Sequence, residues 1–529
     1  MKNVSALLFA FCCWYCSAHA QPTFMTIFHG AGTAQANLNE LSSGNLLVGL
    51  AYQSGTSLMS PEGNILGTHT YAIDTFLVIQ AVKKHLDNDF YFVGGYWKDP
   101  CSKTGANQTY PVIGRMDSLG NVQAQQHYEL NADDCSNMAG DLEVMSDGGV
   151  VAWGVRNYRF FALRADAAGG PLWAKRFSRK AAFQFVKELP GGDLLAGINM
   201  DTAGAVVARL DAAGNFLWCK SYVRQGMVHD CVIESDDSFL ITGYTDSLSS
   251  TNSLVPRPSD FKPKLFMMRL SGMGDVLWCK GYDSTPNTWY SHSISRIVRL
   301  QNGGYAVLAN LGDPTYDRGY RPFLMKTDQN GDTLWTRSMG TNGYQYETTS
   351  LLAYSDGGLI YSGRVWGDLA EDQFNFAYLF KTDAEGHLPC EELHYSVEVV
   401  DLFPTDSSFT LTSVDGAVAR PAFISDATYP PIIQYDGCIT TSVEDVIRGR
   451  KPRVYPNPTP GRFTVEFQDP LMKDSYYSVF DAMGKLLFQR AAAHGKRTEE
   501  VDLTGYSTGT YVIRFTDPEG ACYERVVVE

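Results

Sequence analysis

The sequence lacks the signatures of the best-known catalytic sites. It contains no H-E-x-x-H and no phosphate-binding loop. Basic residues are also in the minority, with 43 Lys and Arg against 58 Asp and Glu and a formal charge of −15, and no stripe of Lys or Arg occurs. Because phosphate binding requires basic patches, this charge argues against nucleic acid as a partner.

Long apolar runs are missing after the first twenty residues, so no membrane-spanning helix is expected in the mature chain. The N-terminus has the features of an export signal: Lys2, the apolar run "ALLFAFCCWYC" and a small-x-small site at 18–20. We therefore predict a signal peptide at residues 1–20. A lipoprotein signal is the alternative, and it would use one of Cys12, Cys13 and Cys16.

Closely spaced cysteine pairs of the zinc-binding type are absent as well. No C-x-x-C remains after cleavage, so no metal site is expected from cysteine spacing. An even number of cysteines stays in the mature chain, and in an exported protein this permits disulfides. Proximity along the chain suggests the pairs Cys101–Cys135, Cys219–Cys231 and Cys390–Cys438.

Glycine is plentiful, with 49 residues, and much of it belongs to one repeated turn. The turn glycine of "DAAGNFLWCK" at 211–220 recurs with Asp or Ser three residues before it, and four copies have Trp four residues after it. Asp or Ser caps such a turn through its side-chain oxygen, and glycine adopts positive φ without steric cost. The seven glycines are Gly63, Gly120, Gly169, Gly214, Gly274, Gly331 and Gly386.

A second turn and a short apolar run such as "VVAWG" or "FLITG" precede each copy, so one unit predicts four antiparallel strands. Seven units predict an all-β fold, a seven-bladed β-propeller over residues 21–390. The segment "TFMTIFHG" at 23–30 aligns with "LWTRSMG" at 334–340, so we expect an N-terminal strand to complete the last blade. An open row of sheets is the alternative, but its ends would be unpaired edges.

A closed ring sorts the connections onto two faces. The tight turns fall on one face, and the long connections fall on the other, here called the long-loop face, where function usually resides. Aromatic residues in these loops are candidates for stacking on sugar rings or contacting a peptide, although they would equally serve to pack the loops. These candidate ligand-binding residues are Trp97, Tyr110, Trp289, Tyr290, His292, Tyr316, Tyr320, Tyr344, Tyr346 and Trp366.

Acidic and histidine residues of the same face include His229, Asp230, Asp133, Asp134, Asp368, Glu371 and Asp372. Paired carboxylates hydrolyse glycosides only at a suitable separation, which a sequence does not give, so no residue is assigned a catalytic role. Loose calcium binding by acidic loops is left open. The stretch from Gly214 to Trp218 resembles repeats of propeller quinoprotein dehydrogenases, but the usual Thr and adjacent cysteine pair are missing, so no cofactor is expected.

A base recurs two residues before the Asp or Ser of the repeated turn. Strand side chains two apart share a face, so each base is expected to pair with the Asp of its own turn and stabilise the blade. A ring of bases for an anionic ligand is the alternative. The bases are Arg115, Arg164, Arg209, Arg269, Lys326 and Lys381.

Beyond the repeats, we expect a β extension at 391–438 that packs on the seventh blade and a linker at 439–453. Residues 454–529 predict a small Ig-like β-sandwich. Its motifs occur in order: Tyr455-Pro456-Asn457-Pro458 with Gly461, Asp481-x-x-Gly484-Lys485, Gly509-x-Tyr511 and a basic, apolar terminus.

This last stretch closely resembles the type A C-terminal sorting domain of the type IX secretion system of Bacteroidetes. The resemblance implies a partner in the type IX secretion machinery, passage across the outer membrane, and secretion or attachment at the cell surface. The repeats also resemble the degenerate propeller repeats of surface proteins from the same bacteria. We therefore expect a displayed protein whose propeller binds a glycan or protein. The alternatives are a propeller hydrolase or lyase acting on polysaccharide or peptide, and a purely structural surface component.

Overall fold

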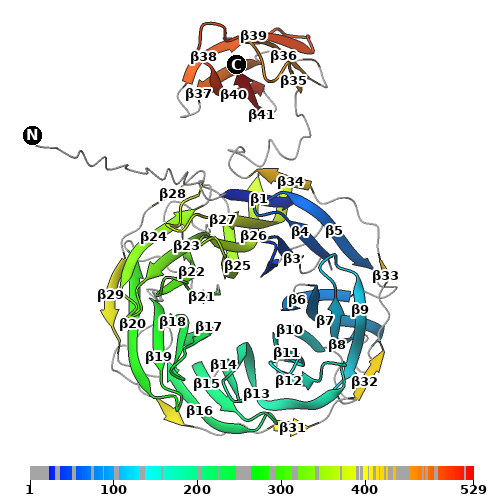
Figure 1. Cartoon of the computed structure of the whole chain (residues 1–529), viewed down its shortest axis with the longest axis vertical. Helices are drawn as coiled ribbons and strands as arrows, with labels where there is room; N and C mark the ends of the chain where they lie inside the picture. The colour runs from blue at the N-terminus through cyan, green and yellow to red at the C-terminus, as the bar shows by residue number, and fades with distance from the viewer. Residues whose placement is uncertain are drawn as a thin grey trace, which may run out of the picture.

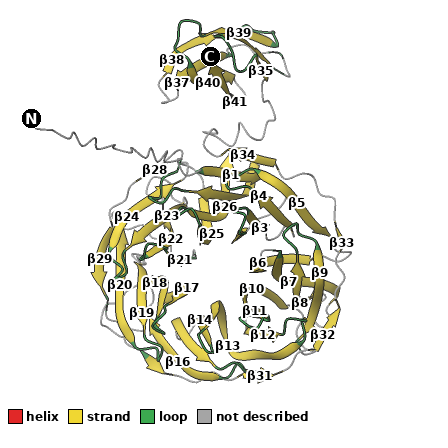
Figure 2. Cartoon of the chain, in the orientation of Figure 1, coloured by secondary structure: helices red, strands yellow, loops and turns green. Residues whose placement is uncertain are grey.

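The computed structural model describes most of the chain. The described residues are 23–29, 36–50, 55–72, 77–86, 88–100, 107–130, 137–156, 159–200, 204–223, 226–245, 264–284, 294–312, 320–339, 345–369, 372–388, 392–393, 397–402, 404, 406–408, 413–415, 418–421, 425–426, 433–436, 453–467, 470, 475–481, 486–517 and 520–529. Every regular element among them is a strand (Figure 2). They accordingly include no helix with the length and apolarity needed to span a membrane.

Seven four-stranded antiparallel sheets stand around a common centre as the blades of a ring (Figure 1). In blades one to six, the first strand of each blade lies innermost. Blade one contains β2 (Ala36–Glu40), β3 (Leu46–Leu50), β4 (Gly55–Met59) and β5 (Ile65–Ala72). Blade two contains β6 (Leu77–Leu86), β7 (Asp89–Pro100), β8 (Asn107–Met116) and β9 (Val122–Glu129).

One long strand, β13 (Pro171–Glu188), belongs to two blades. Its first half is the outer strand of blade three, after β10 (Asn137–Val144), β11 (Val150–Arg156) and β12 (Arg159–Ala165). Its second half is the inner strand of blade four, before β14 (Leu194–Met200), β15 (Gly204–Leu210) and β16 (Phe216–Val223).

The remaining blades repeat the same order. Blade five contains β17 (Gly226–Ile233), β18 (Phe239–Thr245), β19 (Lys264–Leu270) and β20 (Val276–Ser284). Blade six contains β21 (Arg296–Arg299), β22 (Tyr305–Gly312), β23 (Tyr320–Thr327) and β24 (Thr333–Met339). Blade seven contributes three strands, β25 (Gln345–Ala353), β26 (Leu359–Leu369) and β27 (Asp372–Lys381).

The N-terminal strand β1 (Phe24–His29) supplies the fourth strand of blade seven. It pairs antiparallel with β27, from Phe24 opposite Lys381 to Phe28 opposite Ala377. The seven-bladed ring and its closure by an N-terminal strand, both predicted from the repeat, are therefore confirmed. The open row of sheets is excluded.

A second circuit of chain surrounds the ring. Short strands between 392 and 436, here called the belt, add a fifth, antiparallel strand to the outer edge of every blade. Along the chain they pair with blades six, five, four, three, two, one and seven in that order, which is opposite to the order of the blades in the sequence. The belt strands are β28 (Glu392–Leu393), β29 (Val397–Asp401), β30 (Ser407–Ser408), β31 (Ser413–Asp415), β32 (Val418–Pro421), β33 (Ser425–Asp426) and β34 (Ile433–Asp436).

The expectation that this extension packs on the seventh blade is thus wrong for most of its length, because only β34 pairs there, with β1. The longest belt strand, β29, pairs with β20 from Lys280 opposite Asp401 to Ser284 opposite Val397. Leu402 continues this contact by donating its N–H to the carbonyl of Cys279 at 2.8 Å. Since an unpaired outer strand is a template for aggregation, the belt protects all seven edges at once.

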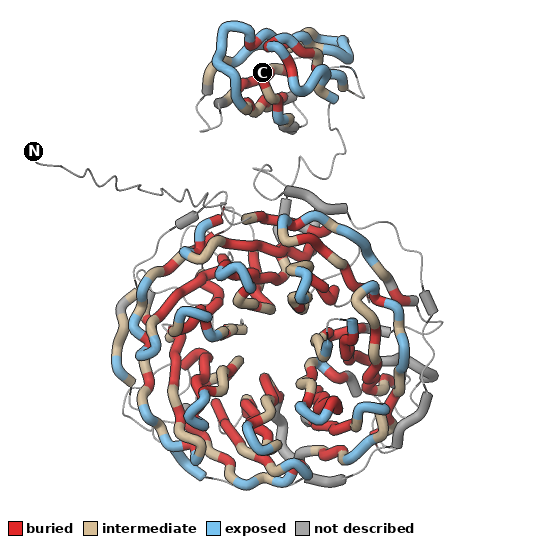
Figure 3. Tube along the Cα trace, viewed as in Figure 1, coloured by how far each residue is buried: buried red, intermediate tan, exposed pale blue. Residues whose placement is uncertain are grey.

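The apolar core lies between adjacent blades. The middle strands are buried on both faces, as in β18, where all seven residues are buried (Figure 3). Consecutive rather than alternating apolar residues, such as "FLITG", are the sequence pattern of strands covered on both sides. Each core cluster therefore joins residues of two neighbouring blades, for example Val207 of blade four and Ile241 of blade five.

Each outer-strand tryptophan packs on the turn glycine of the next blade. A Cβ at Gly274 would lie 2.9 Å from the Trp218 ring and 2.8 Å from the hydroxyl of Tyr222, which itself donates to the Gly274 carbonyl at 2.6 Å. Phe24 of β1 takes the place of the tryptophan against Gly63 and so repeats this contact at the closure. The interpretation of the repeated tryptophans as packing between blades is the one that the structure supports.

Five of the six repeated bases also tie neighbouring blades together, but the partner predicted for the bases is wrong. Arg164 pairs with Asp147 of the first turn of its blade at 2.7 Å, not with Asp166 of the second turn. The acid of the second turn is occupied by its own backbone, as where Asp166 Oδ1 accepts the N–H of Ala168 at 2.9 Å. Arg164 also donates to the carbonyl of Ala212 in the next blade at 3.0 Å, so the base bridges two blades.

The same arrangement recurs in other blades. Arg115, Arg209, Arg269 and Lys381 pair with first-turn acids Asp89, Asp193, Asp236 and Asp356, whereas Lys326 pairs with Glu385 of the next blade. At the closure, Lys381 donates to the carbonyl of Pro61 at 3.2 Å and joins blade seven to blade one. These ion pairs stabilise the ring.

The C-terminal unit has two sheets that enclose a core including Phe463, Val479 and Ile513. One sheet contains β35 (Arg453–Tyr455), β36 (Arg462–Glu466) and β39 (Thr498–Asp502). The other contains β38 (Leu486–Ala491), β37 (Tyr476–Asp481), β40 (Gly509–Asp517) and β41 (Gly520–Val528). The predicted Ig-like β-sandwich is confirmed.

The turn glycines yield a test of the interblade contact. Replacing Gly274 by Ala places a methyl group against Trp218 and Tyr222 at φ +78°, whereas Gly191 has φ +98° and nothing within 4 Å. We expect Gly191→Ala to lower the free energy of unfolding by about 1–2 kcal/mol, the cost of left-handed backbone alone. Gly274→Ala should cost about 1–3 kcal/mol more, because the ring must also shift. Denaturant unfolding measures both, and equal losses would contradict the packing described.

Candidate functional site

The candidate site is the long-loop face of the propeller, where the second and third strands of each blade are connected. Among the described residues, two hairpins have longer strands on this side than the hairpin of blade four. In blade two, β7 and β8 are 12 and 10 residues long, and in blade seven, β26 and β27 are 11 and 10, whereas β14 and β15 of blade four have 7 each. Blades two and seven are the two neighbours of blade one (Figure 1).

Two predicted ligand residues lie at matching places in these elongated hairpins. Trp97 follows Gly94 of β7 by three residues, and Trp366 follows Gly363 of β26 by three residues. Trp97 pairs along the backbone with Thr109, and Trp366 with Asn375. The fold therefore brings two tryptophans far apart in sequence to equivalent positions on either side of blade one.

Other predicted ligand residues have mixed placements. Tyr110 is partly buried in β8, its ring 5.3 Å from that of His127, and Tyr320 is partly buried at the start of β23. The residues Trp289, Tyr290, His292, Tyr316 and Tyr344 lie outside the described part of the chain.

Tyr346 is not a surface platform, contrary to the prediction. It is only 2% exposed in the core between blades six and seven, and its ring packs edge-on against Tyr378 at 5.5 Å. The first residues of β25, including Tyr346, already belong to the packed inner strand. The loop before β25 therefore ends earlier than the sequence pattern predicts.

His229 shows how the inner strands are built. The register of β17 shifts between Val228 and Asp230, so His229 is the extra residue of a β-bulge. Similar shifts occur between Ile79 and Ala81 and between Thr348 and Ser350 of other inner strands. A bulge changes the direction of the side chain, and here it directs His229 toward Ser295 of blade six.

The surroundings of His229 make it a neutral structural residue. It is 3% exposed, and its Nδ1 accepts the backbone N–H of Ser295 at 3.1 Å, 3.2 Å from the Ser295 hydroxyl. Burial, with the nearby Arg296 guanidinium, lowers the pKa of His229 to about 3. A base whose ring nitrogen is engaged by a backbone amide and shielded from solvent is poorly placed for proton transfer to a ligand.

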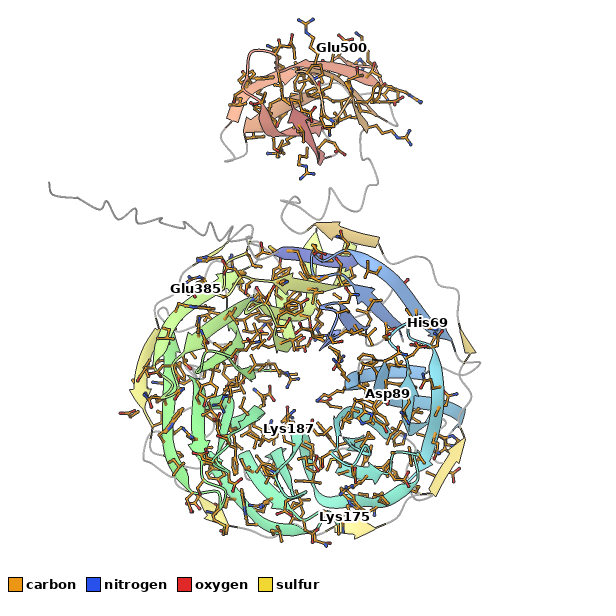
Figure 4. All side chains as sticks on the ribbon, in the orientation of Figure 1. His69, Asp89, Lys175, Lys187, Glu385 and Glu500 are labelled. Carbon is orange, nitrogen blue, oxygen red and sulfur yellow. The ribbon has the colours of Figure 1, made fainter. Side chains whose placement is uncertain are left out.

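The carboxylates on the inner strand of blade three are paired with lysines of the neighbouring blades. Lys83 of blade two lies 3.6 Å from Asp141 and 3.7 Å from Glu143 of blade three, and Lys187 of blade four reaches Glu143 at 3.3 Å. Figure 4 shows Lys187 toward the centre of the ring. These pairs join three successive blades and leave no free pair of acids among them for glycoside hydrolysis.

Asp230 and the other predicted acids do not form a paired acidic site among the described residues. Asp230 accepts the N–H of Ile297 in blade six at 3.2 Å, so it too links two inner strands. Asp368 and Asp372 lie near the ends of β26 and β27, while Asp133, Asp134 and Glu371 lie outside the described residues. Within the described ranges, no group of three or more His, Cys, Asp or Glu side chains is placed to hold a metal ion.

The predicted disulfide Cys219–Cys231 is wrong. Both cysteines are free and buried, as is Cys279. Cys219 and Cys279 follow the repeated tryptophans of blades four and five, where a small side chain fills the core, and burial raises the pKa of each thiol to about 12. Cys101, Cys135, Cys390 and Cys438 lie outside the described residues.

In the C-terminal unit, the first motif is fixed against the last strand. Asn457 donates to the carbonyl of Arg525 at 2.8 Å and accepts the N–H of Val527 at 2.9 Å. Its flanking Pro456 and Pro458 both follow cis peptide bonds. Gly461 has φ +114°, and a Cβ there would lie 2.9 Å from Thr504.

The remaining motif residues organise the second sheet. The Tyr511 ring is buried, and its hydroxyl donates to the carbonyl of Ser507 at 2.5 Å, a local bond typical of Ig-like sandwiches. Asp481 ends β37 opposite Tyr511, and Gly509 begins β40. Tyr455 is 46% exposed, whereas Gly484 and Lys485 lie outside the described residues.

The buried His229 generates a pH prediction. Its pKa is about 3 in the fold against an ordinary 6.5, so the unfolded chain binds the extra proton between these values. Stability is therefore fully present above pH 6.5 and falls as the pH drops toward 3, with a slope of up to about 1.4 kcal/mol per pH unit. We expect His229→Gln to flatten the unfolding free energy between pH 6.5 and 4, measured by denaturant titration. His69→Gln, at a partly exposed position, controls for loss of a histidine as such, and an unchanged slope in His229→Gln would contradict the assignment.

Comparison with solved structures finds remote similarity. The chain resembles a protein of unknown function from Bacteroides caccae, with 11% identity and a TM-score of 0.32 over 49% of this chain and 93% of that one. It resembles hydrazine synthase of Kuenenia stuttgartiensis with 9% identity and a TM-score of 0.45, over 63% and 94%. It also resembles an alpha-L-arabinanase of Penicillium chrysogenum complexed with arabinobiose, with 13% identity and a TM-score of 0.37, over 69% and 99%.

Comparison with curated proteins finds no match to the chain.

The C-terminal unit matches a known family. Residues 453–529 match the family model of the secretion system C-terminal sorting domain. Together with the motif geometry, this match identifies the unit as a type IX secretion system sorting domain, carried by a secreted or cell-surface β-propeller protein.

Proposed function

We propose that the propeller is a displayed binding module that recognises a glycan or protein through its long-loop face. The carrying observation is the pair of elongated hairpins in blades two and seven, with Trp97 and Trp366 at equivalent positions. Tryptophan presents a broad apolar face that stacks on sugar rings and anchors peptides, and it is characteristic of binding sites rather than of loop tips in general.

The structure of the opposite, tight-turn face is consistent with binding on the long-loop face. Its turns are short, and their acids and glycines are engaged by their own backbone and by side chains of neighbouring blades. A rigid ring with variable connections on one face is a common arrangement for recognition, because the scaffold holds the loops in place. The sorting domain delivers the protein to where such a ligand would be met.

The proposal includes features beyond the described residues. A cleavable signal at 1–20, an origin in the Bacteroidetes and the pairs Cys101–Cys135 and Cys390–Cys438 are supported by the N-terminal pattern, the sorting motifs and the even number of cysteines in the mature chain. The linker predicted at 439–453 would separate the belt from the sorting domain, although Arg453 itself belongs to β35.

A glycan array with the full-length protein tests the proposal. We expect binding to a defined set of polysaccharide fragments, weakened at least about tenfold, or about 1.4 kcal/mol, by Trp97→Ala and by Trp366→Ala. Leu119→Ala is the matched control, because Leu119 is 63% exposed in a tight turn on the opposite face. Equal binding by all three variants would contradict the site.

A reducing-end assay on the same fragments separates binding from catalysis. Release of new reducing ends by the wild-type protein would replace the binding proposal with the hydrolase alternative. Absence of both glycan binding and hydrolysis, with retained binding to a protein ligand through the same tryptophans, would identify the ligand class as protein.

A further inference from the structure

A second surface of the propeller carries exposed leucines that do not pack into the core. In the outer strand of blade four, Arg209 pairs with Trp218 and Leu210 pairs with Phe216, so Leu217 is the extra residue of a β-bulge. Blades one, three, five and six have the same bulge at the same place. The leucines there are Leu66, Leu172, Leu277 and Leu334.

The bulge directs each leucine into solvent. The five side chains are 54–59% exposed, although the residues on either side of Leu217 pack into the core. Blade two has Gln123 at the equivalent bulge. Large apolar residues exposed singly are ordinary, but one repeated around a ring by a specific backbone irregularity makes a patterned surface.

All the strongly exposed large apolar side chains in the described part of the propeller lie at this end of the blades. Besides the five leucines they are Leu86, Leu119 and Met273, each in or beside a tight turn. The described belt strands do not cover this end, because they pair with later residues of the outer strands. In blade four, β30 pairs with Lys220 and Ser221, beyond Leu217. We call this surface, formed by the bulge leucines and the tight turns, the short-turn rim.

The ion pairs of the short-turn rim expose the acid in most cases. In five of them the acid faces solvent and the base lies behind it, whereas Arg299 and Arg115 are more exposed than their partners Glu234 and Asp89. Asp275 is 69% exposed and its partner Lys220 13%, and Asp332 is 60% exposed and its partner Lys280 15%. The same holds for Asp147 with Arg164, Asp236 with Arg269 and Glu385 with Lys326. Figure 4 shows Glu385 toward the perimeter of the ring.

The acids stand next to the leucines. Asp275 precedes Leu277 by two residues, and Asp332 precedes Leu334 by two residues. An approaching partner therefore meets carboxylates and isobutyl groups side by side. A partner with Lys or Arg interleaved with apolar side chains would complement both.

We propose that the short-turn rim is a protein-docking surface for a partner that combines basic and apolar side chains, separate from the long-loop face. Blades three to six form its main arc, because they carry bulge leucines in unbroken succession. A second copy of this chain is disfavoured as the occupant, because its net charge is −15. An anionic lipid surface is disfavoured for the same reason.

Synthetic peptides test the docking chemistry with the full-length protein. The probe is a fluorescent peptide of alternating Lys and Leu, compared with Lys/Ser and Glu/Leu peptides of equal length by anisotropy. We expect the Lys/Leu peptide to bind at least about tenfold more tightly than either, with affinity falling as salt rises. Equal binding of the Lys/Leu and Glu/Leu peptides, or tighter binding of anionic phosphatidylglycerol vesicles, would overturn the proposal.

Substitutions at the leucines locate the site. The combined variant Leu217→Ser, Leu277→Ser, Leu334→Ser should weaken Lys/Leu peptide binding at least about tenfold, because it removes apolar contact area. The combined Leu→Met variant at the same positions keeps that area and should bind as wild type. Both should unfold at the wild-type temperature, since these side chains are already exposed. A Ser variant that folds and binds the peptide like wild type would refute the surface, and so would a Met variant that loses binding.

Discussion

The structure depends on the need of every β-strand to have its edges paired or covered. A blade has two edges and two apolar faces, and none of the seven sheets satisfies these alone. The faces are covered by the neighbouring blades, which requires the ring to close, and β1 closes it against β27. The outer edges are covered by the belt, which pairs with all seven blades. The chain therefore secures the ring twice, with its beginning and with the segment after its last blade.

Closure also explains the division between the two faces of the propeller. The tight turns are held by contacts from one blade to the next, such as the Trp218 ring on Gly274 and the Arg164 bridge between Asp147 and Ala212. These contacts fix the short-turn side, which presents the bulge leucines and the outward acids to a partner. The elongated hairpins with Trp97 and Trp366 lie on the long-loop face. One ring can thus present two surfaces of different chemistry.

Repetition made the fold predictable from the sequence, and its absence explains most of the errors. Seven copies of one turn specified the blade number, and the likeness of "TFMTIFHG" to an outer strand specified the closure.

The belt was missed because strands of two to five residues, each pairing with a different blade, carry no periodic pattern. Cys219 was assigned to a disulfide because chain proximity ignores its repeated place in the core. Tyr346 was assigned to a binding loop because the start of β25 has no turn signal, and the bulge leucines were overlooked because a bulge reverses the facing that strict alternation predicts.

Amide hydrogen exchange in the full-length protein tests the doubly closed ring most directly. The decisive amides are those of Lys280–Ser284 in β20 that face β29, since they are edge amides unless the belt is paired. We expect them to be protected to the same degree as the amides of β18 in the middle of that blade, and those of β1 to be protected like β27. Exchange of the belt-facing amides at the rate of a solvent-exposed edge would show that the belt does not enclose the ring, and the account would be wrong at its foundation.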